Sequence, residues 1–330
     1  MLLSGEPVDG LLRRRKLRPA SQKLYMAAVT SFAATYSLGR SPAAGDVDEC
    51  LDRELVQLWL MGEDQQALRV LFYAVKWYWT LQLPQLSRSH ASLQGAARDS
   101  PDRSQEPETW EATLLMCVAL LTAPDSLAPA SVRATAVVGY LLSFDLYARA
   151  MSLVQARRSE LRPPQPVLGS SAAWSLTLWP LTGAQSSKTR TFDDFAFVGA
   201  TNPARLWLAS LCQCLWSSSS ADGLLLGLTP AEYRRLFHAG RRLARLPPST
   251  PHRLRHGGAS ADGALGVSDC TIADRGHWAA IASVRRYRTP ARYLRQLELL
   301  SRRQRVDASA APATIQHLVA HYLRRGSVRR

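Results

Sequence analysis

Lysine is scarce in this chain of 330 residues, where Lys16, Lys23, Lys76 and Lys188 are the only lysines among 41 basic side chains. Cysteine is scarce too: the five cysteines form no CxxC pair and lie far from any histidine pattern, so neither a disulfide framework nor a metal site is expected. No apolar run approaches the roughly 18 residues that a membrane span needs. These features argue against a disulfide-stabilised protein, a metal-binding protein and a membrane-spanning protein. The expectation is a soluble intracellular protein.

Positive charge dominates instead. The net charge is +15 and the isoelectric point lies near 10.2, almost entirely because of arginine. Such a balance favours a polyanionic partner, nucleic acid first and an acidic membrane surface second. A GC-rich genome would also enrich arginine and alanine, so the charge alone does not decide the function.

The first third of the chain predicts a helical domain. A basic arm with Arg13, Arg14, Arg15 and Lys16 comes first, and it either contacts DNA phosphates or stays solvated. Apolar residues then recur at helical spacing in four segments: 21–38, 48–61, 63–81 and 85–97. The polar, proline-containing stretch 98–107 is predicted to be a linker.

The remainder predicts a second, mixed domain. Helices are expected at 110–121, 131–148, 202–216, 229–246 and 290–302, and alternation in 173–179 and 191–198 predicts a β-hairpin. A basic face on the helix 229–246 would lie along a phosphate backbone; it contains Arg234, Arg235, Arg241, Arg242 and Arg245. After a polar linker at 306–312, the chain ends in an amphipathic segment.

The most informative stretch is 250–287. His252 and Arg255 are three residues apart after a helix-starting Thr-Pro pair, so both side chains reach one small anion. Trp278 follows with His277 beside it, and Tyr287 comes nine residues later. A tyrosine hydroxyl attacks a phosphoryl centre only when cationic donors stabilise that centre and a neighbour takes the proton. This stretch supplies both.

The fragments HxLRHG, RGHW and RRY, in this order and spacing, resemble the catalytic box of the tyrosine recombinase (phage integrase) family. The resemblance implies a mainly α fold with a small β-hairpin or sheet. It assigns 1–97 to a helical, SAM-like core-binding domain with its basic arm, 98–107 to a linker and 108–305 to a mixed α/β catalytic domain. The helix in 306–330 would dock on a neighbouring protomer or fold back onto its own domain.

The same resemblance assigns roles to residues. Tyr287 would be the nucleophile, Arg149 and Arg255 would hold the phosphate, His252 would assist proton transfer, and Lys188 on the hairpin would be the general acid. Either Trp278 or His277 would supply a further hydrogen bond to the phosphate, with Trp278 favoured by its spacing.

Three residues complicate this assignment. The family pattern has a glutamate three residues after the first arginine, where this chain has Ser152. Arg157 and Arg158 are alternatives to Arg149 with a poorer helix context. Tyr293 is a competing nucleophile at the wrong distance from the GHW box.

The resemblance therefore implies a site-specific recombinase or integrase that cuts and rejoins double-stranded DNA through a 3′-phosphotyrosyl intermediate, without metal, nucleotide or other cofactor. A homo-oligomer, a tetramer on paired sites, is expected, in the nucleus of a eukaryote or the cytoplasm otherwise. The RGHW box in an Arg-rich chain is closer to recombinases of eukaryotic mobile elements than to bacterial chromosome-resolution enzymes. The alternatives are a catalytically silent DNA-binding derivative, a type IB topoisomerase-like enzyme and a helical scaffold.

Overall fold

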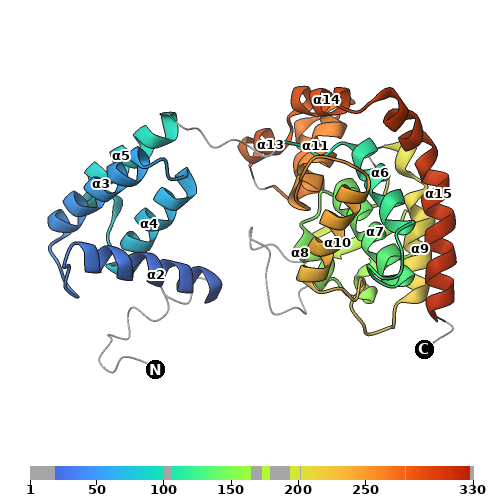
Figure 1. Ribbon diagram of the computed structural model, residues 1–330, viewed down its shortest axis with the longest axis horizontal. Helices are drawn as coiled ribbons and strands as arrows, with labels where there is room; N and C mark the ends of the chain where they lie inside the picture. The colour runs from blue at the N-terminus through green and yellow to red at the C-terminus, as the bar shows by residue number, and fades with distance from the viewer. Residues whose placement is uncertain are drawn as a thin grey trace. The chain divides into compact units, whose positions relative to one another are not determined.

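The computed structural model describes residues 19–99, 106–164, 173–178, 194–200, 202–278 and 280–327. The chain divides into two compact units, Met1–Arg103 and Ser104–Arg330. The division falls inside the stretch 98–107. Each unit is described by itself below, and Figure 1 traces both.

The first unit is helical. Its described elements are α2 (Pro19–Thr35), α3 (Ala44–Leu60), α4 (Gln65–Tyr78), the short 3₁₀ turn η2 (Leu83–Leu86) and α5 (Ser87–Asp99). Helix α2 packs against α4 and α3 against α5, around a core that includes Leu51, Phe72 and Val75. The buried carboxylate of Asp48 on α3 accepts hydrogen bonds from the amides of Arg88 and Ser89 at 3.0 Å, which fixes the start of α5.

The second unit is built around α7 (Ala130–Asp145), which is buried on nearly every side. Helices α6 (Trp110–Leu121), α8 (Ala150–Gln155), α9 (Leu208–Ser218) and α10 (Pro230–Leu243) pack against it. Helix α11 (His252–Ala264) contacts the same central helix and leads to α12 (Asp269–Gly276), α13 (Ile281–Tyr287) and α14 (Pro290–Glu298). A helix that is apolar all round belongs in the centre of a domain, and α7 occupies that place.

A small antiparallel sheet completes this unit. Strand β2 (Ser175–Leu178) pairs with β3 (Asp194–Phe197), with Leu176 opposite Ala196, as the predicted hairpin requires. The two-residue strand β1 (Leu161–Arg162) pairs with the other edge of β2, which the sequence did not predict. The prediction of a mainly α fold with a small sheet is confirmed. Lys188 lies outside the described residues.

The C-terminal part of the second unit differs from the prediction. Helix α14 ends at Glu298, and α15 runs unbroken over Arg302–Ser327, so the polar linker at 306–312 is wrong and a boundary at 305/306 falls inside a helix. Helix α15 packs on α6, α9 and α7 of its own unit through Ile315, Val319 and Leu323 (Figure 1). None of the described helices is long and apolar enough to cross a membrane.

Candidate active site

Helix α11 brings the first predicted residues together. It begins at His252, so His252, Arg255 and His256 lie on its first turns. Two glycines then let neighbouring backbone approach: a Cβ at Gly257 would lie 2.1 Å from the Glu108 carbonyl oxygen, and one at Gly258 would lie 2.0 Å from that of Phe144. The glycines therefore serve close packing, and they place Arg255 against the C-terminal end of α7.

Tyr287 ends α13 and is half-buried among the predicted residues. Its ring stacks on His256 with centroids 4.3 Å apart, lies 4.8 Å from the ring of Trp278 and meets His252 edge-on at 5.9 Å. The guanidinium carbon of Arg255 is 5.3 Å from the Tyr287 ring centroid. The structure thus gathers these side chains at one point of the second unit.

Arg255 is the most deeply buried of the group, with 3% of its surface exposed. Its Nη1 donates to the carbonyl oxygen of Tyr147 and its Nη2 to that of Gly276 at 2.7 Å. Its Nε–H makes no hydrogen bond of normal geometry with the described residues. Burial and the charge of Arg149 lower the pKa of Arg255, while Tyr287 acts in the opposite direction. Arginine stays cationic through such a shift at neutral pH.

Arg149 is the residue directly before α8 and is half-buried. Its charge acts on Arg255 and helps to lower the Arg255 pKa. The alternatives face elsewhere: the Nε of Arg158 donates to the Trp216 carbonyl at 2.7 Å, and Arg157 donates to that of Asp222 at 3.3 Å. An anion bound beside Arg255 would offset the repulsion from Arg149 and would accept a hydrogen bond from the unused Nε–H.

Trp278 contacts both the Arg255 guanidinium and the nucleophile candidate Tyr287. The Arg255 guanidinium carbon is 4.4 Å from the Trp278 ring centroid, and the indole Nε1–H is buried with no hydrogen-bond partner in the part of the chain that the structure describes. A Cβ at Gly276 would lie 2.1 Å from the Trp278 ring, so only glycine at this position lets the indole ring lie this close to the backbone. His277 adopts a left-handed conformation with φ of 52° and caps the end of α12.

His256 follows Arg255 on α11, and its ring stacks directly on Tyr287. Burial, together with the nearby His252 and Arg255, lowers the pKa of His256 to about 3. The imidazole of His256 is therefore neutral at any ordinary pH, and it serves as a flat, uncharged support for the tyrosine ring.

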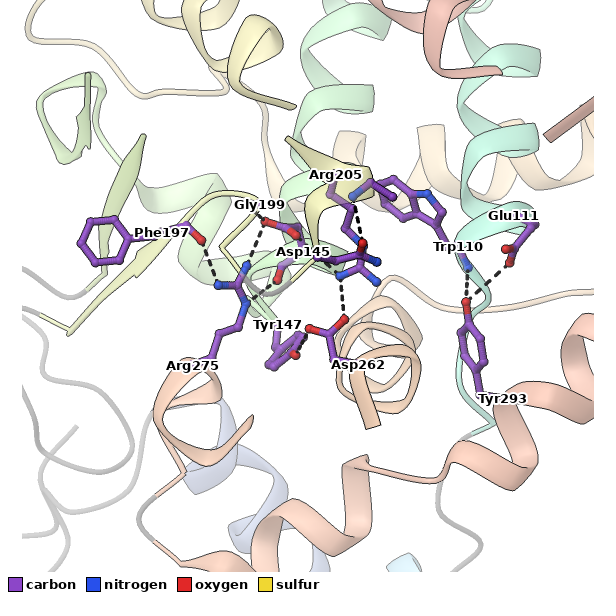
Figure 2. Close-up of polar contacts among 12 residues, drawn as sticks. Trp110, Glu111, Asp145, Tyr147, Phe197, Gly199, Arg205, Asp262, Arg275 and Tyr293 are labelled. Carbon is purple, nitrogen blue, oxygen red and sulfur yellow. Dashed lines mark hydrogen bonds and ion pairs between the residues drawn. The ribbon is translucent and has the colours of Figure 1, made fainter. Parts of the chain in front are cut away.

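Tyr293, the competing tyrosine, is buried on α14. Its hydroxyl oxygen accepts a hydrogen bond from the amide of Trp110 at 3.2 Å, and the hydroxyl donates toward Glu111 at 3.5 Å (Figure 2). These bonds join α14 to the start of α6, so Tyr293 has a packing role.

A buried group of charged residues supports the site, and sequence reasoning missed it. Figure 2 shows this ion cluster, which we define as Asp145, Arg205, Asp262 and Arg275. Arg275 Nη2 donates to Asp145 Oδ2 at 3.0 Å, and Arg205 Nη1 lies 3.0 Å from Asp262 Oδ1 and 3.6 Å from Asp145 Oδ1. The Arg205 pairs have ion-pair distances without hydrogen-bond geometry. A charged Asp145 inside the apolar run YLLSFDLYA was the one signal of this cluster in the sequence.

The basic face of α10 is smaller than predicted. Arg234, Arg235, Arg242 and Arg245 are exposed. Arg241 is buried, with its Nη1 2.5 Å from Glu108 Oε1 and its Nε donating to the Pro247 carbonyl at 2.7 Å, so its assignment to DNA contact is wrong. Arg13, Arg14, Arg15 and Lys16 lie outside the described residues.

No protein-family model matches the chain, and no curated protein matches it. Among solved structures, the chain is similar to XerH site-specific recombinase bound to palindromic difH substrate, in a post-cleavage complex. The identity is 14%, the match covers 86% of this chain and 80% of that chain, and the TM-score is 0.54. XerH bound to difH in a pre-cleavage complex matches with 12% identity, 94% and 90% coverage and a TM-score of 0.42. XerA recombinase matches with 15% identity, 89% and 99% coverage and a TM-score of 0.38. The post-cleavage XerH match, together with the helical layout and the small sheet, shows that this chain has the fold of a tyrosine recombinase.

Proposed function

We propose that this protein is a site-specific DNA recombinase that cuts and rejoins DNA through a covalent bond between Tyr287 and a 3′-phosphate. One observation carries the proposal. The half-buried Tyr287 ring lies against Arg255 and Trp278, the charge of Arg149 acts on Arg255, and the unused N–H donors of Arg255 and Trp278 are buried there. A phosphodiester bound there would accept these hydrogen bonds and neutralise the paired cations.

In this proposal Arg149 and Arg255 hold the non-bridging oxygens of the scissile phosphate. Negative charge grows on these oxygens as the phosphorus becomes five-coordinate, so the donors bind the transition state more tightly than the ground state. Removing one such donor typically costs about 3 kcal/mol, or roughly 10²-fold in rate. The indole N–H of Trp278 adds a neutral donor to the same group.

Proton transfer completes the step. The Tyr287 oxygen forms a bond to phosphorus and its proton passes to His252, while the bond from phosphorus to the 5′-oxygen breaks. Lys188 gives the departing 5′-oxygen a proton, so charge and atoms balance. His256 is unsuited to take the proton because its pKa is lowered to about 3. The phosphotyrosine ester keeps the bond energy, so rejoining needs no nucleotide and no metal.

Double-stranded DNA is the proposed partner, and a homo-oligomer, a tetramer on paired sites, is the proposed assembly. The XerH structure that matches this chain with a TM-score of 0.54 is bound to palindromic difH substrate. The exposed arginines of α10 and the N-terminal arm would contact phosphates and contribute sequence-independent affinity.

A silent DNA-binding protein is the second candidate, and Ser152 favours it. This serine is buried on α8, three residues after Arg149, where the resembling family has glutamate. A serine supplies no negative charge to orient the arginine. Activity therefore has to be measured directly.

The test uses the purified full-length chain in the presence of EDTA and a pool of nicked duplexes of randomised sequence, from which the short cleaved strand diffuses away. The proposal predicts a covalent protein–DNA adduct on denaturing gels for the wild type and for Tyr293→Phe, and no adduct for Tyr287→Phe. The Tyr293 variant is a matched control because it also loses one tyrosine hydroxyl.

Each alternative predicts a different outcome. DNA binding without any adduct would reject the recombinase and favour the silent derivative. Adducts with no sequence preference, together with relaxation of supercoiled plasmid, would favour a topoisomerase. Loss of both binding and adduct would reject every DNA-directed function.

A further inference from the structure

Tyr147 adopts a backbone conformation that side chains normally avoid. It lies at the C-terminal end of α7 with φ of 47°. The amide of Ala148 donates to the Ser143 carbonyl at 3.1 Å and that of Tyr147 to the Phe144 carbonyl at 3.4 Å, which is the bond pair of a Schellman helix end. Glycine usually occupies this position because a Cβ raises the energy of the left-handed region. A tyrosine persists here only where its surroundings hold it.

The surroundings of the Tyr147 side chain are the ion cluster. The side chain is fully buried, and its hydroxyl donates to Asp262 Oδ2 (Figure 2). The guanidinium of Arg275 lies 5.6 Å from its ring centroid and is itself bonded to Asp145. Asp145 also accepts a hydrogen bond from the Gly199 amide at 2.8 Å. Two carboxylates and two guanidiniums thus balance one another in charge, so the Tyr147 hydroxyl is anchored in a group of paired ions.

The other atoms of Tyr147 contact the candidate active site. Its carbonyl oxygen accepts the hydrogen bond from Arg255 Nη1. Its ring stacks on Trp278, with centroids 6.0 Å apart and planes inclined by 22°. Arg149 follows two residues later, at the start of α8. One residue is therefore joined to three of the groups that would hold the phosphate.

We propose that Tyr147 is a positioning residue, anchored by the ion cluster through its hydroxyl, that orients the Arg255 guanidinium and the Trp278 indole toward the phosphate. The proposal rests on the proposed function, because it assumes that Arg255 and Trp278 bind the scissile phosphate. Leucine in place of Tyr147 would fill much of the space but would lose both the anchor and the stacking face.

The first measurement does not depend on catalysis. In protein labelled with ¹⁵N-arginine, the Nε–H signal of Arg255 is assigned by its loss in Arg255→Lys. Tyr147→Leu should shift and broaden this signal. Tyr140→Leu is the matched control, because Tyr140 is an equally buried tyrosine on α7 whose hydroxyl donates to the Tyr233 carbonyl at 2.7 Å. An unchanged Arg255 signal in Tyr147→Leu would overturn the proposal.

The second measurement is the rate of covalent adduct formation with DNA in excess, well below the unfolding temperature of each variant. Tyr147→Leu should slow this step by at least about tenfold with DNA affinity unchanged, since small misplacements of reacting groups have effects of this size. Tyr147→Phe should recover part of the rate because it keeps the ring. Tyr140→Leu should lose thermal stability only.

The outcomes separate the two proposals. No adduct from the wild type would reject the proposed function, and the Arg255 signal would still decide whether Tyr147 positions it. A wild-type adduct with full rates in both Tyr147 variants would show a merely structural role. Should Tyr147→Leu fail to fold, Tyr147→Phe is the variant that decides, and a rate equal to that of the wild type would overturn the proposal.

Discussion

The imidazole of His256 lies against the ring of Tyr287 at 4.3 Å, and its environment makes it an unusual histidine. It is buried, with His252 and Arg255 close by, so protonation would add a positive charge to a site that already contains a cation. A neutral ring at this place keeps Tyr287 in contact with a flat, uncharged surface.

This environment predicts a pH-dependent stability. The pKa of His256 is lowered to about 3 in the folded protein, while the unfolded chain binds the proton near pH 6.5. The unfolded state therefore gains protons first as the pH falls, and the free energy of unfolding should drop by about 2 kcal/mol between pH 7 and pH 5 from this residue alone. Urea titrations at the two pH values should show a drop that is smaller by this amount in His256→Phe.

A matched control is His238→Phe, because His238 is exposed on α10. This control should retain the full acid-induced loss of stability. Equal losses in His256→Phe and the wild type would show that His256 is not held neutral by the fold.

Sequence predicted the residues that are close along the chain and missed those that meet only through packing. His252, Arg255, Trp278 and Tyr287 lie within one short stretch, so spacing and residue type were sufficient to propose that they act together. Arg275 and Asp145 are 130 residues apart, and no local pattern connects them. Such buried charges come together only after α7 and α12 have packed.

Local sequence patterns also predicted some strands and helices and missed others. The hairpin strands were predicted because each alternates apolar and polar residues, but β1 was missed because a two-residue strand has no period. The first part of α15 was predicted to be a linker because Pro312 and its polar neighbours are typical of one. A proline inside a helix removes one hydrogen bond. Burial of Ala308, Ala311 and Ile315 of α15 in the second unit offsets that loss.

Helix α10 offers an internal comparison between arginines. Arg234, Arg235 and Arg242 are exposed, whereas Arg241 pairs with Glu108 in the interior. Each phosphate contact contributes about 0.9 to the slope of log affinity against log salt. Replacing the three exposed arginines by glutamine should therefore lower that slope by about 2 to 3, as measured by fluorescence anisotropy with labelled duplex between 50 and 200 mM salt.

Arg241→Lys is the matched control for this experiment. Lysine keeps a cation beside Glu108 but loses the bond from Arg241 Nε to the Pro247 carbonyl, so the unfolding temperature should fall. Its salt slope should equal that of the wild type. An unchanged slope in the triple variant would show that this face of α10 does not contact DNA.

The charge of the whole molecule is unevenly distributed. Residues 19–99 contain seven lysines or arginines and eight aspartates or glutamates, although the chain as a whole carries +15. The excess positive charge belongs to the N-terminal arm and to residues 100–330. Long-range attraction of the proposed DNA partner, which would depend on summed charge, would therefore come mainly from the part of the chain that contains Tyr287.

The central claim about the molecule is that Tyr287 forms the bond to DNA. The most direct measurement is to isolate the covalent adduct from the nicked duplex pool, digest protein and DNA, and identify the modified peptide by mass spectrometry. The account predicts a nucleotide attached to the tyrosine of the peptide containing Tyr287, through a 3′-phosphate. A nucleotide on Tyr293 or on any other residue, or a 5′-phosphate linkage, would contradict it.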